Sequence, residues 1–384
     1  MGPEFRLLAQ GASWSARAAG HELAAPTEAL DWNYLLRLSR RHRISGLVHA
    51  GLKGGGIVPD GPVAQALDSD ARAIAVDELW TAAEALRLQR ALRAGGVEPM
   101  VLKGVAVAIL AFGRLGLRVN ADIDMLVRPE DVAAGLRILR AEGYGAAVKG
   151  SPEQPSDEWL QLHKDIALSH TSGRGVVELH WRLFDNPRLL DGAHPVGEPV
   201  RLTGAGVIQT LPKDLNLIYL CVHGSEHAWE RLKWLLDVHA LVGRMPRAEL
   251  LSLYAAARAK NVHRPVAQAL LLCSRLFGLP IPREIARSRR DPRIRLLEAL
   301  ALQTLLASRD RELTEIRFGS TPKSLSHYLR ADGWAYWKAE MAFDMADVSQ
   351  APPPGVLRRL GLFGRLVGWG LHHLRSRRRR RRRG

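Results

Sequence analysis

Two aspartates stand one residue apart in the segment RVNADIDMLVRPED, which spans residues 118–131. The apolar residues around Asp122 and Asp124 predict a strand, on which side chains two residues apart point the same way, ~6.6 Å apart at ~3.3 Å per residue. Carboxylates this close repel each other unless cations lie between them. Mg²⁺ often binds carboxylates together with substrate phosphates, and two ions ~3.5–4 Å apart can hold both reacting oxygens of a phosphoryl displacement. The spacing therefore suits a metal site for phosphoryl transfer, although an isolated Asp-x-Asp is more often the solvated face of an edge strand.

A candidate phosphate-binding turn and a third acid lie on either side of this pair. Upstream, the apolar run MVLKG ends at Lys103 and Gly104, directly before a predicted helix. Backbone N–H groups at a helix N-terminus bind phosphate oxygens, glycine lets the backbone approach closely, and lysine adds a cation. Downstream, Glu178 stands in the middle of the apolar strand VVELHW, where a lone carboxylate is costly to bury. A metal ion shared with Asp122 and Asp124 would account for it.

The elements that must position these residues form an α/β unit over residues 97–183. Short apolar runs typical of strands occur in VEPMVLKG, ADIDMLV, YGAAVKG, DIALSH and GVVELHWRL. VAVAILAFG and PEDVAAGLRILRAEGY have the pattern of helices, the second with Pro129 in its first turn. The unit is therefore predicted to contain about five strands and two helices.

Helical segments flank this unit on both sides. The N-terminal part has Asp31 as a helix cap, a break at 54–62 and a long Ala-rich helix over about 63–94. A Pro/Gly-rich connection over 187–212 leads to a second helical region that reaches about residue 346. The predicted domains are a helical segment at 1–96, an α/β core at 97–186, a helical domain at 187–350, and a Pro-rich linker with a basic tail at 351–384.

The order of these features resembles the nucleotidyltransferase superfamily typified by DNA polymerase beta. More closely, the chain resembles the bacterial family of uncharacterised nucleotidyltransferases over roughly residues 30–285. The resemblance implies an α+β fold, in which a small mixed-sheet nucleotidyltransferase core is flanked by an N-terminal helical segment and a C-terminal helical domain. Its most specific element is the series Lys-Gly, Arg, Asp-x-Asp, Glu-x-His, found in the stretches VLKGVAVAILAFGRLGLRVNADIDMLVRPEDVAAGLRILRAEGY, VVELHWRL and LCVHGSEHAWERLKWLLDVHAL.

The resemblance implies roles for the three acids. Asp122, Asp124 and Glu178 would hold the metal ions, Mg²⁺ or Mn²⁺, and Glu178 would also be a candidate base for the acceptor hydroxyl. On a strand, His180 points to the same side as Glu178. It is therefore either a flank of the metal site or an ordinary packed histidine.

The resemblance also implies a phosphate site. Lys103 and Gly104 would hold the nucleotide phosphates, with Arg118 near them. The wider superfamily has Gly-Ser where this chain has Lys-Gly, so a hydroxyl contact to the terminal phosphate is missing here. The close family usually has glycine before the first aspartate, where this chain has Ala121.

The segment HGSEHAWERLKWLLD in the helical half holds a second group of candidate residues. His223 and His227 lie one helical turn apart, and with Glu226 they fit the His-x-x-Glu-His pattern of inverted zinc peptidases. A third zinc ligand in a matching helix is missing, so structural packing or a place in the nucleotide or acceptor pocket is the stronger interpretation. The family resemblance places this helix beside the active cleft, where Lys233 would suit a phosphate and Asp237 would line the pocket.

The net charge of +16 lies mostly in the tail. From residue 356 to the end there are eleven arginines and no acidic residue, which leaves +5 on the rest of the chain. An apolar helical stripe at 356–374 suits contact with an anionic membrane, and the arginines suit RNA, while a solvated basic end is the ordinary alternative. The oligomeric state has no signal in the sequence.

Targeting signals are lacking, and the cysteines favour a reducing compartment. No stretch approaches the ~18 apolar residues of a membrane-spanning helix, and the N-terminus has no secretion signal. Cys221 and Cys273 both lie in apolar helical contexts, which predicts core thiols and a cytoplasmic location.

Taken together, these residues predict a metal-dependent, nucleotide-binding transferase. It would move a nucleoside monophosphate from an NTP such as ATP to an acceptor hydroxyl and release pyrophosphate. The acceptor would be a small molecule, peptide, sugar or RNA. The alternative is a non-catalytic nucleotide- or RNA-binding module on the same fold, and a zinc peptidase at HGSEH is a distant third.

Overall fold

A computed structural model describes residues 1–14, 23, 28–147, 155–190, 192, 194–202, 204, 206–306 and 321–349, with 321–324 and 344–349 described by their backbone alone. The predicted linker and arginine tail at 351–384 lie outside the described residues, as do the RNA or membrane contacts predicted for them. Within the described part of the chain, no helix combines the length and the apolar character needed to cross a membrane.

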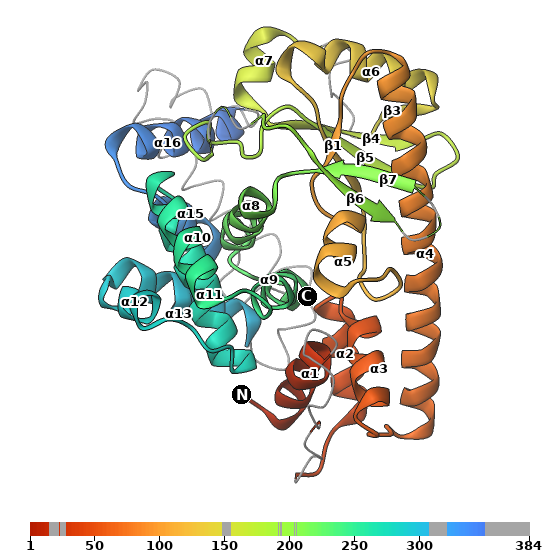
Figure 1. Cartoon of the computed structure of the whole chain (residues 1–384), viewed down its shortest axis with the longest axis vertical. Coiled ribbons are helices and arrows are strands. Elements are labelled where there is room, and N and C mark those ends of the chain that lie inside the picture. Colours follow the sequence, from red (N-terminus) through yellow and green to blue (C-terminus); the bar gives the residue numbers. More distant parts are fainter. Residues whose placement is uncertain are drawn as a thin grey trace, which may run out of the picture.

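A mixed sheet of five strands lies at one end of the molecule (Figure 1). The strand order is β1-β2-β5-β4-β3, in which β2 and β5 pair in parallel and the other neighbours pair antiparallel. The strands are β1 (Met100–Val101), β2 (Ile123–Leu126), β3 (Tyr144–Ala146), β4 (Asp165–His170) and β5 (Val176–His180). The predicted α+β class and the five predicted strands are confirmed, although β1 is only two residues long.

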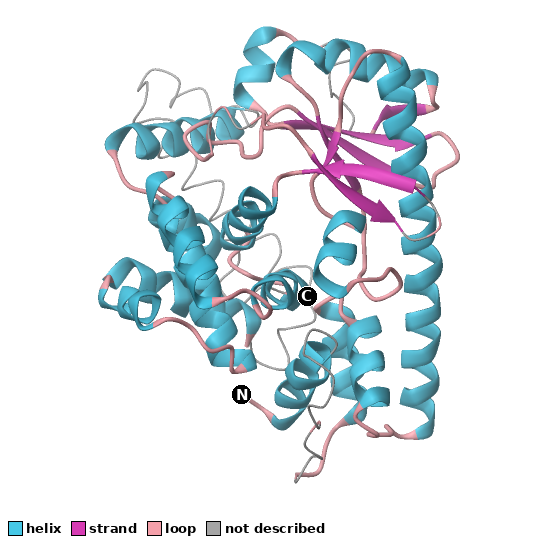
Figure 2. Cartoon of the chain, viewed as in Figure 1, coloured by secondary structure: helices cyan, strands magenta, loops and turns pink. Residues whose placement is uncertain are grey.

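Two helices cover the sheet and form one hydrophobic core with it. Helix α4 (Gly61–Ala94) runs from the sheet to the N-terminal helices, and α6 (Val132–Ala141) follows a 3₁₀ turn, η1 (Pro129–Asp131) (Figure 2). Leu88 of α4 and Leu136 of α6 are buried with Leu179 of β5 in this core. The break predicted near 54–62, the long helix after it and the helix after Pro129 are confirmed.

A second core joins the N-terminal helices to the C-terminal helices. Leu8 and Leu35 from the N-terminal part are buried in the same cluster as Leu236 and Leu270, and the predicted cap Asp31 accepts a hydrogen bond from the Tyr34 N–H. The helices of this part are α1 (Pro3–Trp14), α2 (Trp32–Arg41), α3 (Ser45–Gly54), α8 (Lys213–Glu226), α9 (Leu232–Val242), α10 (Arg247–Ala259), α11 (His263–Phe277), α12 (Arg283–Ala286), the 3₁₀ helix η2 (Arg287–Arg290), α13 (Pro292–Leu305), α15 (Thr321–Leu329) and α16 (Trp334–Ser349).

Helix α5 (Val105–Phe112) lies between these two cores. Its sequence VAVAILAF is apolar on every side, as expected of a helix buried all round. Val105 and Ala106 belong to the core of the sheet, whereas Val107 and Phe112 belong to the core of the helices. The turn that precedes α5 is therefore held from both sides.

The Pro/Gly-rich connection at 187–212 contains a hairpin that the sequence did not indicate. Strands β6 (Glu198–Leu202) and β7 (Gly206–Thr210) form an antiparallel hairpin there. The hairpin lies against the sheet, because the Thr210 hydroxyl donates a 2.6 Å hydrogen bond to the Val101 carbonyl. A short helix that the sequence did not indicate, α7 (Asp157–Leu162), precedes β4.

The single helix predicted across HGSEHAWERLKWLLD is also wrong. Helix α8 ends at Glu226 and α9 begins at Leu232, and the residues between include Ala228 and Trp229 with φ of 47° and 54°. The Trp229 ring packs so closely on Gly224 that a Cβ there would lie 2.3 Å from it. Burial of this tryptophan accompanies the left-handed turn that separates α8 from α9.

Candidate active site

Strand register brings the predicted acids together. Asp124 in β2 and Glu178 in β5 are Cα partners in the parallel pair, so their side chains share one face of the sheet. His180 lies two residues beyond Glu178 on the same face, and Asp122 directly precedes β2. All four residues line one cavity.

His180 is buried among acids instead of packed among apolar side chains. Its Nε2 atom lies 3.1 Å from Asp124 Oδ1 and 3.3 Å from Glu178 Oε2, and its Nδ1 atom lies 3.6 Å from Asp165 Oδ2. The ligand atoms of Asp124, Glu178 and His180 lie within 4.8 Å of one another, close enough to hold one metal ion. Asp122 is outside this cluster.

Lys103 contacts an acid in this structure, although the sequence suggested a phosphate contact. Its Nζ atom lies 2.9 Å from Asp124 Oδ1. Burial disfavours the charged ammonium, but Asp124, Tyr219 and the other two acids outweigh it and hold the pKa of Lys103 well above its usual value. Lys103 is therefore a fixed cation at the carboxylates.

The two aspartates differ in their protonation equilibria. Burial and the neighbouring Asp124 carboxylate raise the pKa of Asp122, against the effect of Lys103. Burial also opposes ionisation of Asp124, but Lys103 and His180 outweigh it and hold the pKa of Asp124 well below its usual range. Asp124 is thus the stably charged carboxylate of the pair.

The turn between β1 and α5 has the conformation that requires glycine. Gly104 has φ 57° and ψ −122° and occupies the N-cap of α5, a region that side-chain-bearing residues rarely adopt. A Cβ there would meet no atom closer than 3.7 Å, so the backbone conformation is the constraint. Gly104 lines the cavity at the N-terminal end of the helix, where backbone N–H groups favour anions.

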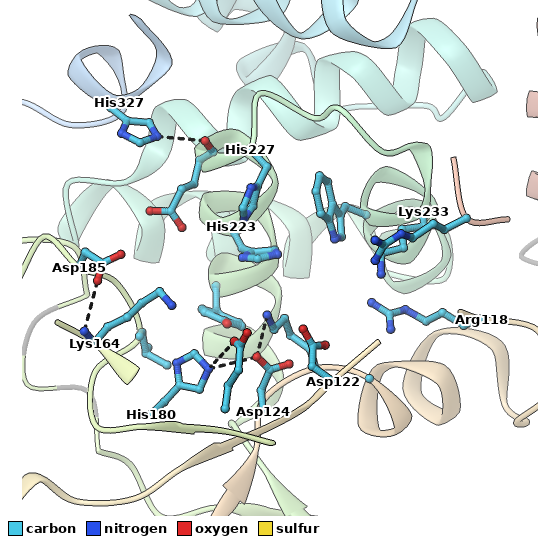
Figure 3. A pocket seen from close by; sticks show the side chains of 18 of the residues that line it. Arg118, Asp122, Asp124, Lys164, His180, Asp185, His223, His227, Lys233 and His327 are labelled. Atoms are coloured by element: carbon cyan, nitrogen blue, oxygen red, sulfur yellow. Dashed lines mark hydrogen bonds and ion pairs between the residues drawn. The ribbon is translucent and has the colours of Figure 1, made fainter. Parts of the chain in front are cut away.

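The cavity has a volume of about 430 Å³ and lies between the sheet and the C-terminal helices. Charged groups of both signs face it, together with four histidines and a few apolar side chains (Figure 3). It is lined by Arg43, Lys103, Gly104, Arg118, Asp122, Asp124, Lys164, Glu178, His180, Leu183, Asp185, Tyr219, His223, Glu226, His227, Lys233, Trp234, His327 and Phe343.

Carboxylates of helices α4 and α9 fix the position of Arg118 through hydrogen bonds. Glu78 of α4 accepts hydrogen bonds from the backbone N–H groups of residues 116–118 and from the Asn120 side chain. Asp237 of α9 accepts from Arg118 Nε at 3.0 Å and from Nη2 at 2.9 Å. Asp237 is fully buried behind Arg118 and does not line the cavity, which differs from its predicted place.

Two cations beside Arg118 have no carboxylate partner among the described residues. Lys233 is 7% exposed, and its Nζ donates to the Val119 carbonyl at 3.3 Å. Burial and the nearby Arg118 and Arg43 lower the pKa of Lys233 to about 7, against the effect of Asp237. Arg43, with a left-handed φ of 57°, reaches the same side of the cavity from the loop after α2. This side of the cavity therefore carries basic groups that no carboxylate of the described residues pairs with.

Aromatic rings on α8 and α9 form the wall opposite the acids. The His227 and Trp234 rings stack with centroids 4.9 Å apart, and His223 meets both rings edge-on. Burial, Lys103 and His227 lower the pKa of His223 well below its usual value, so this imidazole is neutral. Figure 3 shows His223 and His227 facing the cavity above Asp124 and His180.

His223, Glu226 and His227 form a second cluster that could hold a metal ion. Glu226, however, already has a cation at its carboxylate, because Arg330 Nη1 lies 3.3 Å from Glu226 Oε1. Burial opposes ionisation of Glu226, but Arg330 and His227 outweigh it and lower its pKa to about 2. Each cluster therefore has a fixed cation at one of its carboxylates, Arg330 at Glu226 and Lys103 at Asp124.

Comparison with protein families assigns the chain. The model of a family described as uncharacterised nucleotidyltransferase matches residues 28–278, more than half of the sequence. The chain belongs to this family. The general class, nucleotidyl transfer, follows from it. No curated protein matches the chain.

In this nucleotidyltransferase, several cavity residues escaped prediction from the sequence. Arg43, Lys164, Asp185 and His327 come from loops and from α15, far apart along the chain. Lys164 contacts Asp165, and its backbone N–H donates to Asp185 Oδ1 at 3.2 Å. None of these residues stands in a motif, so only the fold brings them to the site.

Proposed function

We propose that this nucleotidyltransferase moves a nucleoside monophosphate from an NTP to an acceptor hydroxyl and releases pyrophosphate. The observation that carries the proposal is the parallel register of Asp124 and Glu178, which places two carboxylates on the floor of a cavity with unpaired cations on one side. ATP is the default donor. The acceptor belongs to a small molecule, peptide, sugar or RNA.

The carboxylates fit a divalent ion, Mg²⁺ or Mn²⁺. Asp124 and Glu178 would hold it, and Asp122 would join them when substrate is bound. Burial and the Asp124 carboxylate raise the pKa of Asp122, and a divalent ion bound there would favour its charged form. A divalent ion bound there would neutralise the carboxylates and stabilise the charge of the transferring phosphoryl group.

The phosphates would bind on the cationic side of the cavity. The backbone at Gly104 and the Lys233 ammonium would contact them, with Arg43 as a further cation that the sequence did not suggest. Arg118 would orient this side, because its own charge is met by Asp237. Lys103 would keep Asp124 ionised and in place, within reach of the phosphate nearest the acids.

The reaction requires one bond to form and one to break. The acceptor oxygen attacks the α-phosphorus, and the bond from that phosphorus to the oxygen that bridges to the β-phosphate breaks, so that pyrophosphate leaves. Glu178, whose side chain is 26% exposed toward the cavity, would take the hydroxyl proton. Most of the acceleration would come from positioning and from charge stabilisation.

A second function, nucleotide binding without turnover, is favoured by one contact. The ammonium of Lys103 lies at Asp124 Oδ1, where it supplies positive charge without a metal. The serine hydroxyl of the wider superfamily's Gly-Ser is absent from this chain, which also favours binding without turnover. A zinc peptidase is less supported, because family membership favours the transferase. A cytoplasmic location stays a prediction from Cys221 and Cys273, which are buried and free.

Label transfer tests the proposal. The protein is incubated with each α-labelled NTP, MgCl₂ or MnCl₂ and a host extract, beside Asp122→Ala and the control Asp214→Asn, which changes an exposed acid of α8. We expect label in a product with the native protein and the control but not with Asp122→Ala. Equal transfer by Asp122→Ala would rule out the site, and NTP binding without transfer would support the second function.

A further inference from the structure

Three strands hold His180 between two sets of acids. Asp124 is the Cα partner of Glu178 across β2 and β5, and Asp165 is the Cα partner of His180 across β4 and β5. Since Glu178 and His180 are two residues apart on β5, all four side chains share one face of the sheet. The strand pairing therefore fixes the position of this histidine.

The two ring nitrogens of His180 face different partners. Nε2 points toward the cluster, 3.1 Å from Asp124 Oδ1 and 3.3 Å from Glu178 Oε2, while Nδ1 faces Asp165 Oδ2 at 3.6 Å. Histidines that bind metals commonly donate the N–H of the other ring nitrogen to a carboxylate, which fixes the ring and its tautomer. Asp165 faces Nδ1 at ion-pair distance, slightly beyond hydrogen-bond reach, and Lys164 contacts Asp165 in turn.

From this geometry we infer that His180 is itself a metal ligand, with Asp165 facing its other ring nitrogen, and that the centre therefore prefers Mn²⁺ to Mg²⁺. The inference rests on the proposed function, because it places the ion at the same acids. The inferred ligands are the carboxylates of Asp124 and Glu178 and the imidazole of His180, in place of three carboxylates. Asp122 would then lie on the side of the ion that faces the phosphates.

Ligand type determines the metal preference. Mg²⁺ is a hard cation that prefers oxygen ligands and octahedral geometry. An imidazole nitrogen favours transition ions, and among them Mn²⁺ still accepts carboxylate and phosphate oxygens. A site with one nitrogen and two carboxylate ligands therefore combines a nucleotide-compatible ion with a nitrogen donor that Mg²⁺ uses poorly.

Pulsed electron paramagnetic resonance of the full chain with MnCl₂ alone tests the inference. Protein labelled with ¹⁵N-histidine is compared with unlabelled protein, and His180→Gln is compared with the control His223→Gln, which removes a ligand from the cluster on α8. We expect a histidine nitrogen coupling that persists in His223→Gln and disappears in His180→Gln. We also expect the ratio of Mn²⁺ to Mg²⁺ affinity to fall about tenfold or more in His180→Gln.

A positioning role for Asp165 gives an independent readout. Asp165→Asn should keep the nitrogen coupling but weaken Mn²⁺ binding about 10- to 100-fold. If His180→Gln fails to fold, a coupling that survives in the double variant His223→Gln/His227→Gln supports His180, and its loss there overturns the inference.

Two further results would contradict the inference without touching the proposed function. One is native protein that transfers label but shows no histidine nitrogen coupling. The other is an unchanged ratio of Mn²⁺ to Mg²⁺ affinity in folded His180→Gln. Conversely, a nitrogen coupling from His180 in a protein that transfers no label would contradict the proposed function and still support the metal site.

Discussion

At the scale of single residues, the cavity separates two kinds of charge. The floor holds carboxylates neutralised in part by Lys103 and His180. One side holds Lys233, a nearly buried amine whose pKa is lowered to about 7 by burial and by its neighbours Arg118 and Arg43. A buried cation without a carboxylate partner costs stability in the free protein and favours binding of an anion.

Substitution of Lys233 by methionine separates the cost of the buried charge to stability from its contribution to anion binding. Because the folded pKa of about 7 lies below the unfolded value of ~10.4, protonated Lys233 destabilises the folded protein at low pH, and the free energy of unfolding rises as the pH increases from ~7 to ~10. Lys233→Met should therefore raise the melting temperature at pH 6 by about 2 °C or more, while NTP binding weakens about tenfold.

The matching pH profile uses the native protein. NTP affinity should fall as the pH rises through about 7, as Lys233 loses its proton in the presence of Arg118, Arg43, Asp237 and Asp122. Lys233→Met should flatten this profile, and the exposed control Lys53→Met should not. Fluorescence or calorimetric titration at pH 6 and pH 8 measures both. A melting temperature that falls in Lys233→Met at pH 6 would contradict the account.

The acids, Lys103 and His180 could be picked out from the sequence, whereas Asp165 and Arg43 could not. The spacing of Asp122 and Asp124 and the lone Glu178 in an apolar strand are local signals. Asp165 and Arg43 have no such signal, because strand pairing and a left-handed loop residue bring them to the site.

At the scale of elements, the turn before α5 is the part most sensitive to a single change. Gly104 has φ 57° and ψ −122° and opens the helix toward the cavity. The helix it begins is buried in two cores, so the turn cannot relax by moving the helix. Strain introduced at this residue should therefore act on both stability and phosphate binding.

Gly104→Ala tests this. The alanine would be forced into a backbone region that costs about 1–2 kcal/mol, so urea unfolding should show a loss of that size, together with weaker NTP binding. Gly61→Ala is the control, because Gly61 begins α4 in open space without positive φ. Normal stability and NTP affinity in Gly104→Ala would show that the turn has no such role.

The periodicity of apolar residues predicted most helices and strands, but it missed the β6–β7 hairpin and the end of α8. The β6–β7 hairpin was hidden in a Pro/Gly-rich connection, and the end of α8 carries neither glycine nor proline at Ala228 and Trp229. The left-handed turn there accompanies burial of Trp229 against Gly224, which is a tertiary effect. Residue propensities alone therefore predict one continuous helix across this turn.

At the scale of the whole molecule, the site is closed by helices distant in sequence. Arg330, which follows α15, lies 3.0 Å from Glu340 Oε1 of α16 and 3.3 Å from Glu226 Oε1 of α8. Arg330 and Glu340 are deeply buried, and the Glu226 side chain is 16% exposed. The sequence predicted a helical domain here. It gave no sign that one guanidinium, directly after α15, would contact acids of both α8 and α16 at the edge of the cavity.

Arg330→Met should uncouple these helices. It leaves two buried carboxylates without their cation, which typically costs about 3–5 kcal/mol at neutral pH. In the native protein Arg330 and His227 outweigh burial and lower the pKa of Glu226 to about 2, below the unfolded ~4.3. That stabilisation is present above pH ~4.3 and is lost as the pH falls toward 2.

Chemical unfolding at two pH values checks this prediction. The deficit of Arg330→Met should be large at pH 7.5 and should shrink by pH ~3, because the native protein then loses most of the stabilisation that Arg330 gives to Glu226. Arg295→Met, at an exposed position of α13, should be neutral at both. A deficit independent of pH would mean that lost packing, and not lost charge, governs the effect.

The central claim is that carboxylates gathered by parallel strands carry out nucleotidyl transfer. A dual-label experiment tests it most directly: one NTP carrying a label on either the α- or the γ-phosphate is supplied with Mn²⁺ and host extract to the native protein and to Asp124→Asn. We expect that the α-label enters the product, that the γ-label leaves as pyrophosphate, and that Asp124→Asn loses at least about a thousandfold in rate. Transfer of γ-label, or undiminished transfer of α-label by folded Asp124→Asn, would contradict it.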